Sequence, residues 1–215
     1  MASADAEKQE DPLEAVKANT PLPFPRLKSL DPSHEYLARR GFSQQAMEVF
    51  GVGYFTGSRG LMKGLAAIPI HNPQGELVAY AGKSPDEEMG AGGYTLPDTF
   101  RKDLELYNIH RAVEAVGTNE RGLIVVADFF DVFRLHEAGY ENAVALMGDE
   151  LSDAQLRLIF QAIGGGGKVS LVLSKDNEGF VDILAKLLGL FYVRLWRTES
   201  PPSILTEQDI RSILG

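Results

Sequence analysis

The stretch GLIVVADFFDVFRLHEAGYENAVALMG, residues 122–148, decides the fold class. It begins with a continuous apolar run, 122–127, rich in the β-branched residues typical of a strand buried on both faces. A segment with helical spacing follows and ends at Gly139, and a second apolar run occupies 143–147. This order of strand, helix and strand predicts one βαβ unit of a parallel sheet.

The same alternation continues towards the C-terminus. Apolar runs at 169–173 and 191–196 predict two more strands, with helical spacing between and after them. We therefore expect an α/β fold over residues 119–215, with a four-stranded parallel sheet flanked by helices. Asp31-Pro32 and Ser43 predict the starts of two helices that end at Gly41 and Gly51, and apolar runs at 65–70 and 76–81, joined by HNPQG, predict a hairpin. Residues 28–118 are therefore expected to form a smaller α+β subdomain. Residues 1–27, rich in Ala, Glu, Lys and Pro, predict a disordered tail or linker.

The composition excludes several classes of protein. None of the 215 residues is cysteine, so disulfides and cysteine-ligated zinc are impossible, and a reducing compartment fits. No apolar run approaches the ~20 residues of a membrane span and no signal peptide is visible, so we expect a cytoplasmic protein without membrane contact. The net charge of −9 argues against indiscriminate nucleic-acid binding but leaves room for a local basic groove.

Acidic residues gather where the predicted strands end. Asp128 and Asp131 follow the first strand, Asp176 and Glu178 follow the third, and another acidic pair occupies 149–150. Because ligands of parallel sheets bind at the carboxyl ends of the strands, we expect these side chains at the binding edge. Converging carboxylates can hold Mg²⁺, but acids near helix N-termini also stabilise helices without any ligand.

Several blocks, in order, resemble the catalytic core of bacterial-type DNA primases of the replicative, phage or plasmid kind. IVVADFFDVFRLHEAGYENAVALMG is similar to the first block of the Toprim domain, in which a strand ends in Glu-Gly-aromatic-x-Asp. LVLSKDNEGF is similar to the second block, usually Asp-x-Asp. Upstream, HEYLARRGFS, GVGY, AAIPIHNPQGELVAYAGK and FRKDLELYN resemble the N-terminal half of the primase core. The resemblance covers about residues 28 to 215 and implies a Toprim-type sheet that binds Mg²⁺ for phosphoryl transfer.

The resemblance breaks at two of the acids. The family's Glu falls on Ala127, and the first Asp of the second block falls on Ser174. The Asp of the first block and the second Asp of the second block, which the resemblance implies as metal ligands, are kept as Asp131 and Asp176. The resemblance assigns the Glu to acid–base chemistry, and loss of a general base alone costs roughly 10²–10⁴-fold. We therefore expect a degenerate, catalytically silent site that binds Mg²⁺ weakly if at all. Zinc is not expected, because the cysteines of the family's zinc-binding module are missing.

Basic residues in the N-terminal half predict contact with nucleic acid. Lys102 is the family's Lys in FRKDLELYN, Arg101 precedes it, and Lys63 lies upstream. The resemblance implies that such residues guide single-stranded DNA or RNA. Solvated surface is the alternative interpretation for each of them. A replication protein is the other class of partner that we expect.

Three functions follow from the sequence. The first is a degenerate primase-like protein of DNA replication or nucleic-acid metabolism, which acts by binding nucleic acid or a replication partner. The second is an active Mg²⁺-dependent primase or nuclease that uses Asp131, Asp176 and either Asp128 or Glu178. The third is a protein-interaction module without nucleic acid, which the acidic net charge favours if the basic residues are scattered.

Overall fold

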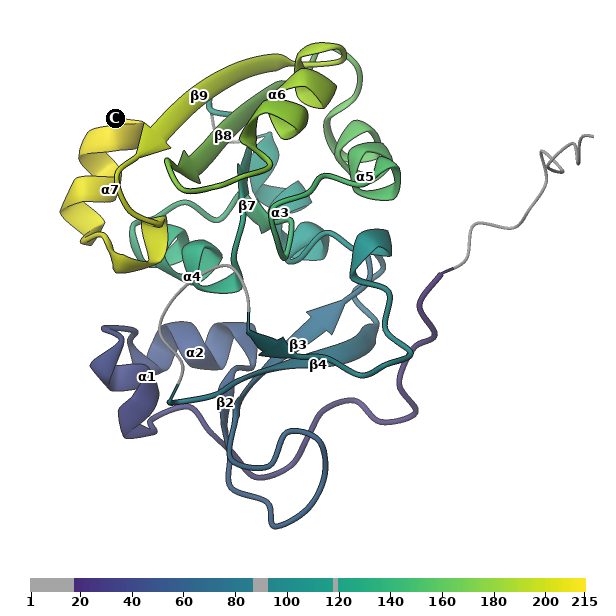
Figure 1. Cartoon of the computed structure of the whole chain (residues 1–215), viewed down its shortest axis with the longest axis vertical. Helices are drawn as coiled ribbons and strands as arrows, with labels where there is room; N and C mark the ends of the chain where they lie inside the picture. Colours follow the sequence, from purple (N-terminus) through teal and green to yellow (C-terminus); the bar gives the residue numbers. More distant parts are fainter. Residues whose placement is uncertain (1–17, 87–92, 118–119) are drawn as a thin grey trace, which may run out of the picture.

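The computed structural model describes residues 18–86, 93–117 and 120–215. They form two sheets, with helices packed between and around them (Figure 1). The N-terminal sheet is antiparallel and the C-terminal sheet is parallel. No helix in these three ranges is both long and apolar enough to cross a membrane.

The N-terminal sheet has five strands in sequence order, each antiparallel to the next. Its strands are β1 (Leu30–Asp31), β2 (Gly53–Phe55), β3 (Ala66–His71), β4 (Leu77–Lys83) and β5 (Tyr94–Thr95). Two short helices precede β2, namely α1 (Glu35–Arg39) and α2 (Gln44–Phe50). The expected hairpin is the β3–β4 pair. The expected helix from Ser43 is α2, whose left-handed Gly51 ends it.

One predicted helix start is wrong. The Asp31-Pro32 pair indicated an N-cap at Asp31, but Asp31 belongs to β1, where it pairs with Tyr54. Its carboxylate accepts hydrogen bonds from the backbone and hydroxyl of Ser33, at 2.9 and 2.7 Å. This local turn competes with helix formation. As a result, α1 begins later, with His34 as its N-cap.

The end of the expected tail lies along the antiparallel sheet. The Leu22 amide donates to the Leu77 carbonyl at 2.7 Å, and the Leu27 amide donates to the Tyr80 hydroxyl at 2.9 Å. The buried Asn19 side chain donates to the Arg101 carbonyl at 2.9 Å. Residues 1–17 of that prediction lie outside the described residues, and the domain boundaries stay predictions.

The C-terminal sheet confirms the fold class. Four parallel strands run in the order β7-β6-β8-β9, so the chain crosses over through helices. The strands are β6 (Leu123–Val126), β7 (Ala143–Ala145), β8 (Lys168–Ser174) and β9 (Tyr192–Thr198). The helices are α3 (Ile109–Val116), α4 (Phe129–Glu137), α5 (Asp153–Ile163), α6 (Phe180–Leu188) and α7 (Glu207–Leu214), with single 3₁₀ turns η1 (Lys102–Leu104) and η2 (Pro202–Ile204).

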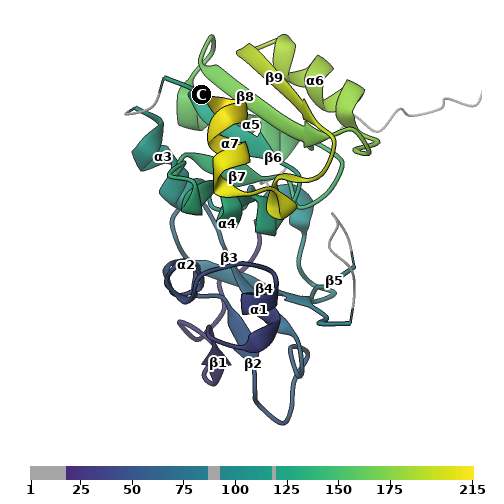
Figure 2. The same cartoon turned by 90° about the vertical axis from the view of Figure 1, so that its left-hand side faces the viewer.

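Helix α4 joins the two halves of the molecule. It lies between the sheets, beside α2 (Figures 1 and 2). Phe130 and Phe133 of α4 are buried, and their rings lie 5.4 Å from Phe42 and 4.7 Å from Phe50, respectively. Aromatic pairs at these separations stabilise beyond their buried area alone. The start of α4, which carries the first acidic residues, is therefore held rigidly against both halves.

Candidate functional site

The carboxyl ends of β6 and β8 meet at one cavity. The two strands are parallel neighbours, so the residues that follow them share an edge of the sheet. The cavity there has a volume of about 310 Å³. It is lined by six positions singled out from the sequence: Ala127, Asp128, Asp131, Asp149, Ser174 and Asp176. We call it the acid-lined pocket.

Asp131 acts as a helix cap inside this pocket. It is only 2% exposed. One carboxylate oxygen accepts from the Asp128 amide at 3.2 Å, and the other accepts from the Ser203 amide at 2.8 Å. The first bond belongs to a capping box, in which the Asp128 side chain accepts from the Asp131 amide in return, and Asp128 also accepts from the Phe130 amide at 2.9 Å. Both oxygens of Asp131 are therefore engaged by backbone donors.

Asp128 links the pocket to the N-terminal sheet. The Tyr94 hydroxyl, on β5, lies 2.8 and 2.9 Å from its two oxygens and donates to the carboxylate. The Lys83 ammonium lies 4.9 Å from the centre of the Tyr94 ring. Sequence reasoning missed this role of Tyr94. No local pattern indicates a bond between residues 34 positions apart.

Burial changes the ionisation of both carboxyls. It raises the pKa of Asp128, although hydrogen bonds from the Phe130 amide and the Tyr94 hydroxyl oppose it. Burial also raises the pKa of Asp131, and the adjacent Asp128 charge raises it further. The pKa of Tyr94 lies well above its ordinary value, because of burial and the same Asp128 charge. The carboxyls of Asp128 and Asp131 together thus hold a proton more tightly than two free carboxyls would.

The donors present do not fit the magnesium site that the resemblance implies. Ala127 offers no side-chain oxygen, and Ser174 offers a neutral hydroxyl where Mg²⁺ prefers carboxylates. Asp176 is exposed, whereas Asp131 is buried with both oxygens engaged. Across the described ranges, no group of three or more His, Cys, Asp or Glu side chains is placed to hold a metal ion.

Asp128 and Glu178, the alternatives for a third magnesium ligand, are also poorly placed. The carboxylate of Asp128 is occupied by Tyr94. Glu178 lines a separate hollow together with Glu150 and Asp182. Asp149 lines both hollows. Its pKa is raised by burial and by the Glu178 charge, against the lowering effect of Lys102.

Of the predicted nucleic-acid residues, Lys102 lies nearest the acid-lined pocket. Lys102 is exposed, its ammonium donates to the Met147 carbonyl at 3.4 Å, just after β7, and its charge lowers the pKa of Asp149. Arg101 is exposed and its guanidinium pairs with Asp103 at 2.8 Å. Lys63 lies in the turn between β2 and β3 and does not line the pocket. The structure therefore brings one of the three basic residues near the strand ends.

Comparison with known proteins places this arrangement in context. Residues 121–185 match the model of the Toprim domain. The chain is 31% identical over 163 residues to a DNA primase of Mycoplasma genitalium, covering 74% of this chain and 24% of that protein. It is 33% identical over 115 residues to a DNA primase of Rickettsia felis, covering 52% of this chain and 18% of that protein. The chain thus spans about a quarter or less of these relatives' length.

Solved structures share the fold. The zinc-binding and RNA polymerase domains of the Aquifex aeolicus primase superpose with a TM-score of 0.69 and 21% identity, covering 84% of this chain and 54% of that one. The E. coli primase catalytic core superposes with a TM-score of 0.66 and 19% identity, covering 85% and 71%. A DnaG primase catalytic domain bound to ssDNA superposes with a TM-score of 0.65 and 18% identity, covering 85% and 70%.

Proposed function

Because the chain is a primase-like Toprim protein, we propose that it serves DNA replication by binding single-stranded nucleic acid or a replication partner, without catalysing phosphoryl transfer. The observation that carries this proposal is the pair Ala127 and Ser174 at the ends of β6 and β8. These positions lack the carboxylates that a Mg²⁺ site at this edge needs.

The remaining acids support the same conclusion. A metal carboxylate must present its oxygens to the cavity, but those of Asp131 cap α4 and bind Ser203. Asp128 is tied to Tyr94, so it stabilises the junction between the two halves of the molecule. We infer that carboxylates once suited to a cation now serve the fold.

Binding of a nucleic-acid strand is supported by Lys102. Lys102 is exposed beside the strand ends, and no described carboxylate pairs with its ammonium within salt-bridge distance. A structurally similar primase domain is bound to ssDNA. Since the acidic residues Asp149 and Glu150 lie close by, we expect modest affinity that falls as salt rises.

The test is fluorescence anisotropy with a labelled single-stranded oligonucleotide, first in the absence of divalent metal and then with added Mg²⁺. We expect Lys102→Gln to weaken binding and to flatten the slope of log K against log salt by about 0.7, the change expected when one phosphate of a single strand is no longer neutralised. Lys168→Gln is the matched control. It removes the same charge at an exposed position at the start of β8, the opposite edge of the sheet.

Three outcomes would redirect the proposal. Equal affinities and salt slopes for Lys102→Gln and Lys168→Gln would remove Lys102 from the interface. Absence of binding at low salt would favour a protein-interaction module. Strong binding that requires Mg²⁺ would favour the active enzyme instead.

A further inference from the structure

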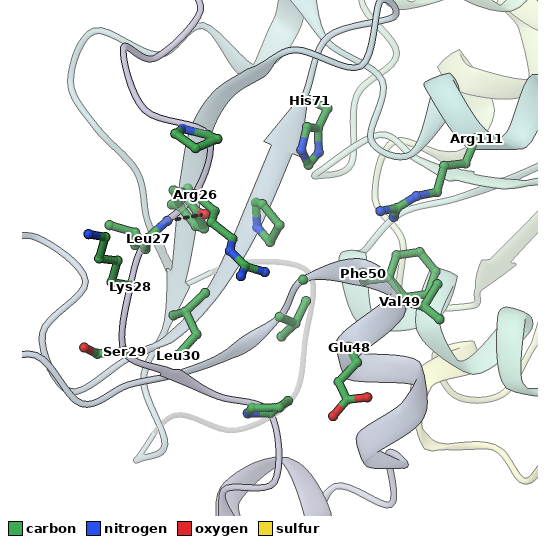
Figure 3. Close-up of a pocket in the computed structure, with 16 residues that line it drawn as sticks. Arg26, Leu27, Lys28, Ser29, Leu30, Glu48, Val49, Phe50, His71 and Arg111 are labelled. Carbon is green, nitrogen blue, oxygen red and sulfur yellow. Dashed lines mark hydrogen bonds between the residues drawn. The ribbon is translucent and has the colours of Figure 1, made fainter.

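A larger hollow lies where the segment before β1 passes α2 and β3 (Figure 3). Its volume of about 610 Å³ is within the usual range for small-molecule sites. It shares no lining residue with the acid-lined pocket. We call it the basic hollow.

Cationic groups from separate elements point into this space. Figure 3 shows the guanidinium groups of Arg26 and Arg111 directed towards the same region, with the His71 ring above it. Arg26 precedes β1, His71 ends β3 and Arg111 lies in the first turn of α3. Lys28 adds a positive charge at the rim. Residues far apart in sequence thus create a local excess of positive charge in a chain whose net charge is −9.

These charges are not neutralised within the described residues. None of the ion pairs found there involves Arg26, Lys28 or Arg111. Glu48 is the one carboxylate among the lining residues, and it accepts a hydrogen bond from Gln44 at 2.7 Å. Unpaired like charges in one hollow repel each other, and a bound anion would relieve that repulsion.

The side chains of Arg111, His71 and Tyr80 form the polar side of the hollow. The Arg111 guanidinium lies 5.3 Å from the centre of the Phe50 ring, which fixes its direction. The pKa of His71 is lowered by burial and by the Arg111 charge, so a neutral imidazole faces the space. The Tyr80 hydroxyl accepts from the Leu27 amide at 2.9 Å and keeps its own hydrogen for a ligand oxygen.

The other wall is apolar. It is formed by Leu30, Phe50, Val52 and Pro69, together with Leu27. A ligand that fits must therefore carry anionic groups at one end and a flat or apolar body at the other. Arginine forks match phosphate oxygens in a bidentate manner.

We propose that the basic hollow binds a nucleoside phosphate, with its phosphates on Arg26 and Arg111 and its nucleoside against the apolar wall. The same chemistry is offered by a free nucleotide and by the terminal phosphate of a strand. The site is separate from the acid-lined pocket and from Lys102, so it stands independently of the proposed function.

Isothermal titration of the whole chain with ATP, ADP and pyrophosphate, in EDTA, tests the site. We expect binding of ATP and ADP, weakened about tenfold or more by Arg26→Gln and by Arg111→Gln, because each removes a charge-assisted hydrogen bond. Arg39→Gln, at an exposed cation that pairs with Glu35, is the matched control and should leave the affinity unchanged. Competition by 5′-phosphorylated but not by 5′-hydroxyl oligonucleotides would identify a strand end as the ligand; no competition by either would identify free nucleotide.

A second variant guards against misfolding. Arg111 packs on Phe50, so if Arg111→Gln unfolds the chain, Arg111→Lys, which keeps the charge, is measured in its place. Arg26 is exposed, and its replacement should leave the melting temperature unchanged. The proposal is overturned if neither nucleotides nor phosphorylated strands bind. It is also overturned if Arg26→Gln and Arg111→Lys both leave affinity unchanged, or if Lys102→Gln abolishes nucleotide binding, which would place the ligand at the acid-lined pocket.

Discussion

Restoring the two missing carboxylates should restore a cation site. Ala127→Glu combined with Ser174→Asp places two acids beside Asp131 and Asp176 in the acid-lined pocket. Ala127 is 8% exposed and packs with the apolar side chains around Leu146 and Leu173, so a new carboxylate there is largely desolvated without metal. An uncompensated buried charge costs about 3–5 kcal/mol. We therefore expect the double variant to be less stable than the parent in EDTA.

Mg²⁺ should reverse much of that loss. At about 100 times its dissociation constant, a ligand that binds only the folded state stabilises it by about 2.7 kcal/mol. For a chain of this size, 1 kcal/mol corresponds to about 2–4 °C in Tm. The predicted rise in Tm on adding Mg²⁺ is thus about 5–10 °C for the double variant, against little change for the parent.

Calorimetry with and without Mg²⁺ measures this difference. The matched control is Ala127→Gln with Ser174→Asn, which has nearly the same shape but adds no charge. Equal Mg²⁺ responses in the parent, the acidic variant and the amide control would refute the reasoning. In that case the family's acids would not correspond to Ala127 and Ser174.

The junction between the two halves gives two further predictions. Tyr94→Phe removes the hydroxyl that donates to Asp128, and should lower the free energy of unfolding by about 1.5–3 kcal/mol in urea titrations; an unchanged midpoint would contradict the bond's role. Because burial raises the folded-state pKa values of Asp128 and Asp131 above the unfolded values near about 4, the folded chain binds more protons in that interval. The stability that these carboxyls contribute is therefore complete below about pH 4 and is lost as pH rises through the folded pKa values. Asp128→Asn should make this decline shallower, and a decline of unchanged slope in urea midpoints across pH would count against the coupled pair.

The parallel sheet could be predicted from the sequence because three of its four strands are buried on both faces, whereas β9 is largely exposed. Strands β6 and β7 are continuous apolar runs, and the apolar stretch of β8 is interrupted only by Ser170. The short strands β1 and β5 could not be found this way, since each has only two residues and depends on its neighbour for its conformation. Asp31 illustrates the same limit: a strand pairing overrode a plausible helix cap.

The candidate site was predictable in position but not in its interactions. The order of strands and acids placed Asp131 and Asp176 at one edge, and both line the same cavity. Nothing local in the sequence indicates that Ser203 and Tyr94 engage the carboxylates, because these bonds depend on the packing of η2 and β5 against the start of α4. Nor could Arg26 and Arg111 be paired from sequence, since folding brings them to one hollow.

The measurement that most directly tests the central claim is incorporation of labelled ribonucleotides on a single-stranded template with Mg²⁺, at protein concentrations that saturate the template. We predict no product above that of the chain carrying Asp131→Asn and Asp176→Asn, because the parent already lacks a working acid set. Template-dependent product from the parent that disappears in this double variant would contradict the account and establish an active enzyme.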